Sequence, residues 1–392
     1  MVSHDPIQFA SGLSAKLATR SRHVCVFLGA GMSRACGLPD VVQLQERVVK
    51  ALEKTDAAVL SEQLKAGNLE HVLTRLRRIA ALLTGDQQVD GLTAASAVAV
   101  DTAICAAIVG ELDLDAADLG PAVRLAAWVA RADYHLPVEL FTVNYDLLLE
   151  TALEQLRVPY FDGFIGTLRA RFQTELVEGI SRGRSDLVPA FFARLWKLHG
   201  SVNWAWEEGK QIVRLGHPVP DGDMAAIYPS DTKYEESRRV PFVVLQDRFR
   251  RALHQPETLV LISGYSFSDD HLNELLFDAA TRRERSELVA FCFSDPPQVL
   301  AERAKTTPNL QVVSPKGAIL GGIEAAWKAP DEAPPNLWEN DEFALCNFAH
   351  LAAYLARSAT REPERDELIA ALLEKVAPDV AGGGPAEAVT DG

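Results

Sequence analysis

The sequence has 392 residues, 48% of them hydrophobic, and a formal net charge of −15. This length fits one large domain with insertions, or two to three modules. The acidic balance argues against a protein that binds nucleic acid over its whole surface. No uncharged run approaches the roughly 18–20 residues that span a membrane, and the N-terminal residues lack the compact apolar core of a signal peptide. We therefore expect a soluble, cytoplasmic protein with no membrane contact and no direct nucleic-acid contact.

The cysteines are few and scattered, and no two of them form a CxxC pair. This spacing supports neither a disulfide framework nor a structural zinc cluster. Cys25 and Cys292 lie within apolar runs, where we expect small buried thiols. The five residues are Cys25, Cys36, Cys105, Cys292 and Cys346. We expect no metal site.

Short apolar runs predict buried strands at residues 23–29, 137–143, 194–200, 258–264, 287–294 and 310–314. They are apolar on both alternating faces, which is typical of a parallel sheet covered on both sides. Helical patterns fill the gaps between them. The alternation predicts an α/β fold with a Rossmann-like, doubly wound and mainly parallel sheet.

The helical spacing is uninterrupted over residues 41–135, which indicates a helical module inserted into the sheet domain. The sheet domain itself then comprises residues 1–40 and 136–328. Residues 151–190 also look helical, and residues 205–245 look rich in loops. After a proline-rich stretch, residues 329–378 predict a C-terminal segment with two helices, and residues 379–392 a disordered tail.

A glycine turn follows the first predicted strand. Gly29, Ala30 and Gly31 allow backbone N–H groups to approach a pyrophosphate, with help from the start of the next helix, and Ser33 could donate to the same group. The dinucleotide fingerprint GxGxxG is incomplete, because Arg34 stands at its last glycine, and no acidic strand end follows about twenty residues on. The turn indicates a nucleotide but not an ordinary dehydrogenase, and a plain tight turn stays open.

Two further polar clusters stand where predicted strands end, which is where open α/β sheets bind ligands. Asn144 and Asp146 follow the run at 137–143, where Asp146 could instead cap the next helix. His199 and Gly200 follow the run at 194–200. A histidine at the mouth of a cleft can accept or relay a proton near neutral pH, although a lone histidine can also be structural.

The last cluster begins at Gly264, after the run at 258–264. Glycine permits close backbone approach, and Ser266 could bind a ribose or a phosphate. In the structural alternative, Ser268 caps the next helix while Asp269 and Asp270 complement its dipole. The two accounts use different groups and are compatible.

The order of these motifs, Gly-Ala-Gly-x-Ser with Gly-x-Pro-Asp, then Thr-x-Asn-x-Asp, His-Gly and Gly-Tyr-Ser, resembles the sirtuin family of NAD-dependent protein deacylases. The resemblance covers residues 20 to 315 or so. It implies that NAD is bound, with Asn144 and Asp146 at the nicotinamide ribose and His199 as the general base. It also implies a set of residues along the rest of the dinucleotide: Gly29, Ala30, Gly31, Ser33, Asp40, Gly264, Tyr265 and Ser266.

The sequence also departs from the sirtuin pattern. Sirtuin deacylases carry a four-cysteine zinc module that this chain lacks, and Val41 and Val42 replace the Phe-Arg that follows Pro-Asp. With the large helical insertion, these departures resemble the bacterial sirtuin-like NAD hydrolases of antiphage defence. A chain of this kind resembles the stand-alone subunit that pairs with a HerA-type hexameric ATPase, or less closely one encoded beside a short Argonaute.

This resemblance implies that NAD is the substrate and that no zinc is used. Hydrolysis of the nicotinamide–ribose bond passes through an oxocarbenium-like state. Asn144 would position water and ribose hydroxyls, His199 would activate the water or a hydroxyl, and Asp146 would stabilise positive charge. The helical insertion and C-terminal helices lead us to expect a homo-oligomer or an ATPase partner that controls the site. The alternatives are a non-catalytic subunit that senses NAD or ADP-ribose, and a zinc-free deacylase or ADP-ribosyltransferase.

Overall fold

The centre of the fold is a nine-stranded sheet in the computed structural model, which describes residues 3–181, 188–189, 191–207, 211–219, 225–227, 240–282, 286–332 and 337–358. The strands from one edge to the other are β14 (Ile323–Ala326), β13 (Gly317–Leu320), β12 (Leu310–Val313), β11 (Glu287–Phe291), β10 (Thr258–Ser263), β1 (His23–Leu28), β2 (Glu139–Thr142), β6 (Ala193–Lys197) and β3 (Tyr160–Phe161). The strands from β12 to β3 run parallel, and β13 and β14 extend the sheet antiparallel. Each of the predicted strands is present, so the prediction of a Rossmann-like α/β fold is confirmed.

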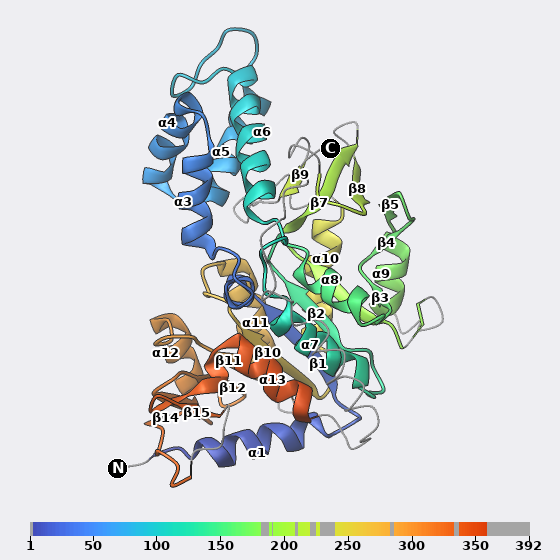
Figure 1. The fold of residues 1–392 in the computed structure, drawn as a ribbon, viewed down its shortest axis with the longest axis vertical. Coiled ribbons are helices and arrows are strands. Elements are labelled where there is room, and N and C mark those ends of the chain that lie inside the picture. The colour runs from blue at the N-terminus through green and yellow to red at the C-terminus, as the bar shows by residue number, and fades with distance from the viewer. Residues whose placement is uncertain are drawn as a thin grey trace, which may run out of the picture.

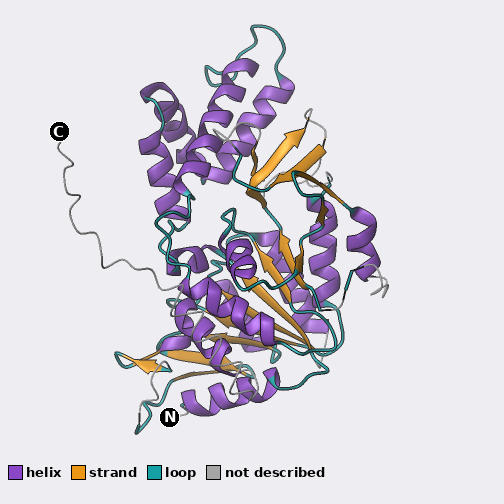
Figure 2. Cartoon of the chain, turned by 45° about the vertical axis from the view of Figure 1, so that its right-hand side comes forward, coloured by secondary structure: helices purple, strands orange, loops and turns teal. Residues whose placement is uncertain are grey.

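Both faces of this sheet are buried, as the apolar runs require. In β1, Val24 and Val26 point into one hydrophobic core, whereas Cys25 and Phe27 point into another on the opposite face. Helices cover both sides of the strands in Figure 2. The first core is covered by α1 (Pro6–Leu17), α7 (Gly120–Arg131), α8 (Leu148–Gln155) and α13 (Phe348–Ser358). The second is covered by α10 (Phe242–Leu253), α11 (Asp270–Arg282) and α12 (Gln298–Thr306).

Between β1 and β2 the chain forms the short α2 (Ala30–Ala35) and then a group of helices that we call the helical module. The module consists of α3 (Val41–Ala51), α4 (Lys54–Gln63), the 3-10 turn η1 (Leu64–Ala66), α5 (Leu69–Leu82) and α6 (Ala94–Glu111). Figure 1 shows it standing out from one end of the sheet domain, with α3, α4 and α5 packed against α6. The next helix, α7, packs instead against α8 and α13, so it belongs to the layer that covers the sheet.

Helix α6 is the one described helix with the length and hydropathy of a membrane span. A single such helix is weak evidence, because core helices of soluble proteins share these properties. The charge in its middle, Asp101, lies 2.9 Å from the guanidinium of Arg77 on α5. Helix α6 is therefore tied to its neighbour by an ion pair as well as by apolar packing.

A second sheet corrects the prediction of helices for residues 151–190. That stretch does form α8 and α9 (Thr174–Ser181), but β3 and two strands of the second sheet lie between them. The strand order of this sheet is β4 (Phe164–Ile165), β5 (Arg169–Phe172), β8 (Gln211–Leu215), β7 (Gly200–Glu207) and β9 (Ala225–Ile227). Because β5 pairs with β8, distant in the sequence, local spacing does not reveal it.

Near its C-terminal end, the described chain forms a small hairpin and two helical segments. These are β15 (Trp338–Glu339), β16 (Glu342–Phe343), the 3-10 turn η3 (Ala344–Cys346) and α13. The first of the two predicted terminal helices is α13. The second one and the predicted tail at 379–392 lie outside the described residues.

Candidate functional site

The four polar motifs meet at the carboxyl ends of four inner strands of the large sheet. Gly264 follows β10, Gly29 follows β1, Asn144 follows β2 and His199 follows β6. These four strands are neighbours in the sheet and run parallel, so their carboxyl ends lie side by side. The structure therefore gathers motifs that are far apart in the sequence into one row, at the position where open α/β sheets bind ligands.

The glycine turn packs directly against the loop after β10. Gly29 N–H donates to the Ser263 carbonyl at 3.1 Å, and Gly31 N–H donates to the Gly264 carbonyl at 2.8 Å. A Cβ on Gly31 would lie 2.5 Å from Gly264 Cα, and Gly264 itself has a φ of +66°. These glycines thus serve the close approach of two backbones, whether or not a phosphate also binds here.

We expect Gly31→Ala to lower the free energy of unfolding by about 1–3 kcal/mol, because a methyl group must push two backbone segments apart. Gly12→Ala on α1 is the matched control. No atom lies within 4 Å of a Cβ there, so alanine should leave stability unchanged or raise it by about 0.5–1 kcal/mol. Urea unfolding of both variants measures the difference. Equal values for the two would contradict the tight packing.

The segment after β2 is fastened to the glycine turn. Asn144 Nδ2 donates to the Gly29 carbonyl at 3.0 Å. The Ser33 hydroxyl donates to Asp146 Oδ2 at 2.5 Å, and Asp146 Oδ1 accepts from the Leu148 N–H at 3.1 Å. The N-cap of α8 is Leu147, so Asp146 is not the cap that its alternative interpretation suggested; it bonds the first N–H of the helix from the position before the cap, and it also accepts from the Ser33 hydroxyl.

A buried lysine at the end of β6 donates hydrogen bonds to the backbone of the same segment. Lys197, at the end of β6 and 3% exposed, donates to the carbonyls of Tyr145 and Asp146 and lies 3.0 Å from Glu150 Oε1. The Tyr145 carbonyl also accepts from the Val202 N–H at 3.0 Å. These bonds fix the backbone between Asn144 and Asp146, so the position of the Asn144 amide is determined before any ligand binds.

His199 lies between two carboxylates. Its Nε2 is 3.2 Å from Asp269 Oδ2, and its Nδ1 is 3.9 Å from Glu70 Oε1. Burial disfavours the charged imidazole, but the hydrogen bond to Asp269 and the charges of Glu70 and Asp269 outweigh it and raise the pKa of His199. Burial likewise disfavours an ionised Asp269, yet the bond to His199 keeps the pKa of that carboxyl below its usual range.

This geometry defines which nitrogen of His199 can act as a base. An ionised carboxylate only accepts hydrogen bonds, so Nε2 carries the proton that is shared with Asp269. In the neutral imidazole the lone pair is then on Nδ1. The arrangement can therefore accept a proton at Nδ1 while Asp269 stabilises the imidazolium that forms.

Neither Asp269 nor Glu70 is identified as a site residue by the sequence. Asp269 is expected only to complement a helix dipole; in the structure it is also the cap of α11, because its Oδ1 accepts from the N–H groups of His271 and Leu272. The expected cap, Ser268, bonds the Ser266 hydroxyl. Glu70 lies in the first turn of α5, and no local pattern distinguishes it from other acidic residues at helix starts.

Three further predicted residues have structural partners. Asp40 caps α3 through Gln43 N–H at 2.9 Å. The rings of Tyr265 and Phe27 make a T-shaped contact with their centroids 4.8 Å apart. The Tyr265 hydroxyl lies 3.1 Å from Asn273 Oδ1. Ser266 is exposed at the site edge. Of the three, Ser266 is the most exposed, and its hydroxyl bonds the Ser268 hydroxyl.

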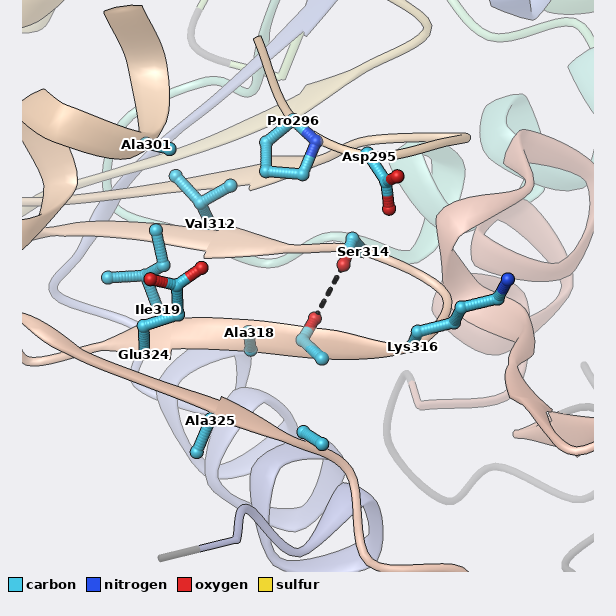
Figure 3. A pocket seen from close by; sticks show the side chains of 12 residues that line it. Asp295, Pro296, Ala301, Val312, Ser314, Lys316, Ala318, Ile319, Glu324 and Ala325 are labelled. Carbon is cyan, nitrogen blue, oxygen red and sulfur yellow. Dashed lines mark hydrogen bonds between the residues drawn. The ribbon is translucent and has the colours of Figure 1, made fainter. Parts of the chain in front are cut away.

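A depression of about 400 Å³ lies further along the sheet, beside β12, β13 and β14. Asp295, which follows β11, and Lys316 lie at one end of it, and Ser314 Oγ donates to the Gly317 carbonyl at 2.9 Å (Figure 3). None of the predicted site residues lines it. The depression therefore does not coincide with the row of motifs, and we base the site on the row.

A buried polar network lies at the amino-terminal ends of β1 and β2, opposite the row of motifs. Glu139 binds Arg248 through both carboxylate oxygens, Trp196 Nε1 at 2.7 Å and His23 Nε2 at 2.8 Å. Together with Cys25, His23 and Glu139 have the spacing of metal ligands. The guanidinium already neutralises the carboxylate and would repel a cation, so these residues fit an ion-pair network better than a metal site.

Comparison with known families adds one finding. Residues 138–313 match the model of the SIR2-like domain, a span that contains Asn144, His199, Asp269 and Gly264 but not the glycine turn or Glu70. A search of curated proteins finds no match to the chain. The similarity to the SIR2-like domain is thus a finding about residues 138–313, which make up less than half of the chain.

Proposed function

We propose that this protein hydrolyses NAD+ to nicotinamide and ADP-ribose. Members of the SIR2-like family are NAD-dependent enzymes, and residues 138–313 match that family. The observation that carries the proposal is the Asp269–His199 pair beside Asn144 at the carboxyl edge of the sheet. A buried histidine oriented by a carboxylate is suited to accept a proton from water.

The proposed reaction breaks the bond between the nicotinamide nitrogen and C1′ of the ribose. The electron pair of that bond leaves with nicotinamide, which becomes neutral, so no acid catalyst is required. Water adds its oxygen to C1′, and its proton passes to Nδ1 of His199. The oxocarbenium-like state between these events carries positive charge on the ribose.

The remaining residues of the site have supporting roles in this proposal. Asn144, whose Nδ2 is bound to Gly29, would accept from water or a ribose hydroxyl through Oδ1. Asp146 accepts from two uncharged donors, the Ser33 hydroxyl and the Leu148 N–H, and its carboxylate would stabilise the positive ribose. Gly264 and Ser266 are proposed for the adenosine side, as the sirtuin resemblance implies.

Purified protein incubated with NAD+ should release nicotinamide and ADP-ribose in equal amounts, resolved by chromatography. Asn144→Ala should lose most of this activity, by about 10²-fold, because water and ribose lose their positioning group. His217→Ala is the control, since this histidine is exposed and bonds the neighbouring Pro218 carbonyl. Transfer of ADP-ribose to protein would indicate a transferase, and unaffected hydrolysis in Asn144→Ala would remove the residue from the mechanism.

The resemblance to antiphage NAD hydrolases supports a proposed role as an NAD-depleting effector in defence. Because unregulated NAD hydrolysis would harm the host cell, we propose control by self-association or by a HerA-type hexameric ATPase. Light scattering coupled to size exclusion, with and without the ATPase, tests this. A chain that stays monomeric and alone under both conditions would contradict it.

The second candidate is a non-catalytic subunit that senses NAD or ADP-ribose. It is favoured by the hydrogen bonds that already occupy Ser33, Asn144 and Asp146 within the protein. A sensor would bind NAD+ measurably and leave it intact under every condition of the same assay, including the presence of the ATPase.

A further inference from the structure

The helical module contacts the candidate site through the side chain of Glu70. Glu70 is the second residue of α5, and its carboxylate accepts a hydrogen bond from the Tyr145 hydroxyl at 2.7 Å. The same carboxylate oxygen lies 3.9 Å from Nδ1 of His199. Glu70 thus touches both the segment that carries Asn144 and the nitrogen that would act as the base.

We propose that Glu70 is a positioning residue through which the placement of the helical module controls the proton-accepting atom of His199. The proposal rests on the proposed function for its catalytic consequence. It goes beyond that function because it assigns to the inserted helices a direct influence on the site. Glu70 is near the start of α5, the end of the helix that faces the sheet domain, and α5 packs against α6. A displacement of the module would therefore move Glu70 directly.

Other charged and titratable groups also lie near His199, and their positions show which nitrogen of the ring each carboxylate faces. Asp269, ahead of α11, binds Nε2, so it orients the ring from the sheet side. The Tyr265 hydroxyl lies 3.2 Å from the Asp269 carbonyl. Arg77 of α5, whose charge also reaches Tyr145, is paired with Asp101 of α6. Glu70 is therefore the carboxylate on the Nδ1 side, and it is the one that moves if the module moves.

The consequence is a dependence on pH with a definite sign. Burial lowers the pKa of His199, whereas Asp269 and Glu70 raise it, and their combined effect prevails. Only the neutral imidazole can accept a proton, so activity should increase as pH rises through this raised pKa. A module displaced from the sheet domain would remove the Glu70 charge and shift this increase to lower pH.

The test compares Glu70→Gln with the wild-type chain in two measurements. The first is the titration of the histidine side chains by NMR, with the His199 signal identified by its loss in His199→Ala. Glu70→Gln should lower the pKa of His199, because glutamine keeps the size and the acceptor for Tyr145 but removes the charge. This titration requires no NAD cleavage, so it decides the proposal even if the chain proves to be a sensor.

The second measurement is the pH profile of NAD cleavage, which should shift to lower pH in the same variant. Glu62→Gln on α4 is the matched control in the module, since Glu62 is exposed and pairs with Lys65; it should move neither quantity. Glu70→Ala, which also removes the charge, should shift the titration in the same direction and provides a second variant should the first fold poorly. A His199 titration that is unchanged in Glu70→Gln would overturn the proposal.

Discussion

His199→Ala is expected to lower the rate of NAD cleavage by about 10²–10⁴-fold, the usual contribution of a general base. The physical reason is the pairing of Nε2 with Asp269, which leaves Nδ1 as the proton acceptor and stabilises the charged ring. Steady-state rates measured across pH, with product analysis, check this. In the wild-type chain the rate should increase with pH through the raised pKa of His199.

Asp269→Asn distinguishes the base from its orienting partner. Asparagine can still contact Nε2 but no longer supplies a negative charge, so the pKa of His199 should fall and the rate should decrease less than in His199→Ala. His217→Ala again serves as the control for loss of an imidazole. A His199→Ala variant that retains the wild-type rate would contradict the assignment of the base, whatever its stability.

Arg248→Met is expected to lower the free energy of unfolding by about 3–5 kcal/mol, because it leaves the buried Glu139 without its cation. Glu139 is 2% exposed and accepts from both Arg248 and Trp196. The loss is a large fraction of the roughly 5–15 kcal/mol that stabilises a typical protein. Urea unfolding at neutral pH, where the two-state model is checked with two probes, measures it.

Arg250→Met is the matched control on the same helix. Arg250 is half exposed and pairs with Asp247 at the surface, so its loss should cost less than about 1 kcal/mol. Similar losses in the two variants would contradict the buried network.

The pH dependence of this stability follows from Glu139. Burial disfavours its ionised form, but Arg248 and His23 outweigh burial, and the pKa of Glu139 lies far below its usual range. The folded pKa is depressed, so the network stabilises the protein fully above the unfolded pKa of about 4.3 and loses this effect as pH falls. In Arg248→Met the penalty should shrink on acidification, since a protonated Glu139 no longer needs a cation.

The sequence by itself determined the six central parallel strands of the large sheet and the row of motifs that follows them, but not β3, β13 or β14. Runs such as 23–29 and 258–264 are short, apolar on both faces and bounded by turn residues, a pattern typical of central parallel strands. Once the strands are parallel, the residues after them must meet at one edge, so Asn144 and His199 become neighbours although 55 positions separate them (199 − 144). This inference needs only local periodicity and the geometry of a parallel sheet.

Only the tertiary structure decided what surrounds His199 and which predicted residues serve the fold. Glu70 reaches the site because the start of α5 lies against the segments after β2 and β6, and the helical pattern around it carries no sign of that contact. The strands between α8 and α9 pair with distant partners, so their short segments looked helical. Asp40 resembles a ligand in its motif yet caps α3. Local spacing reports which face of an element is apolar, whereas contacts between polar side chains depend on how the elements are placed.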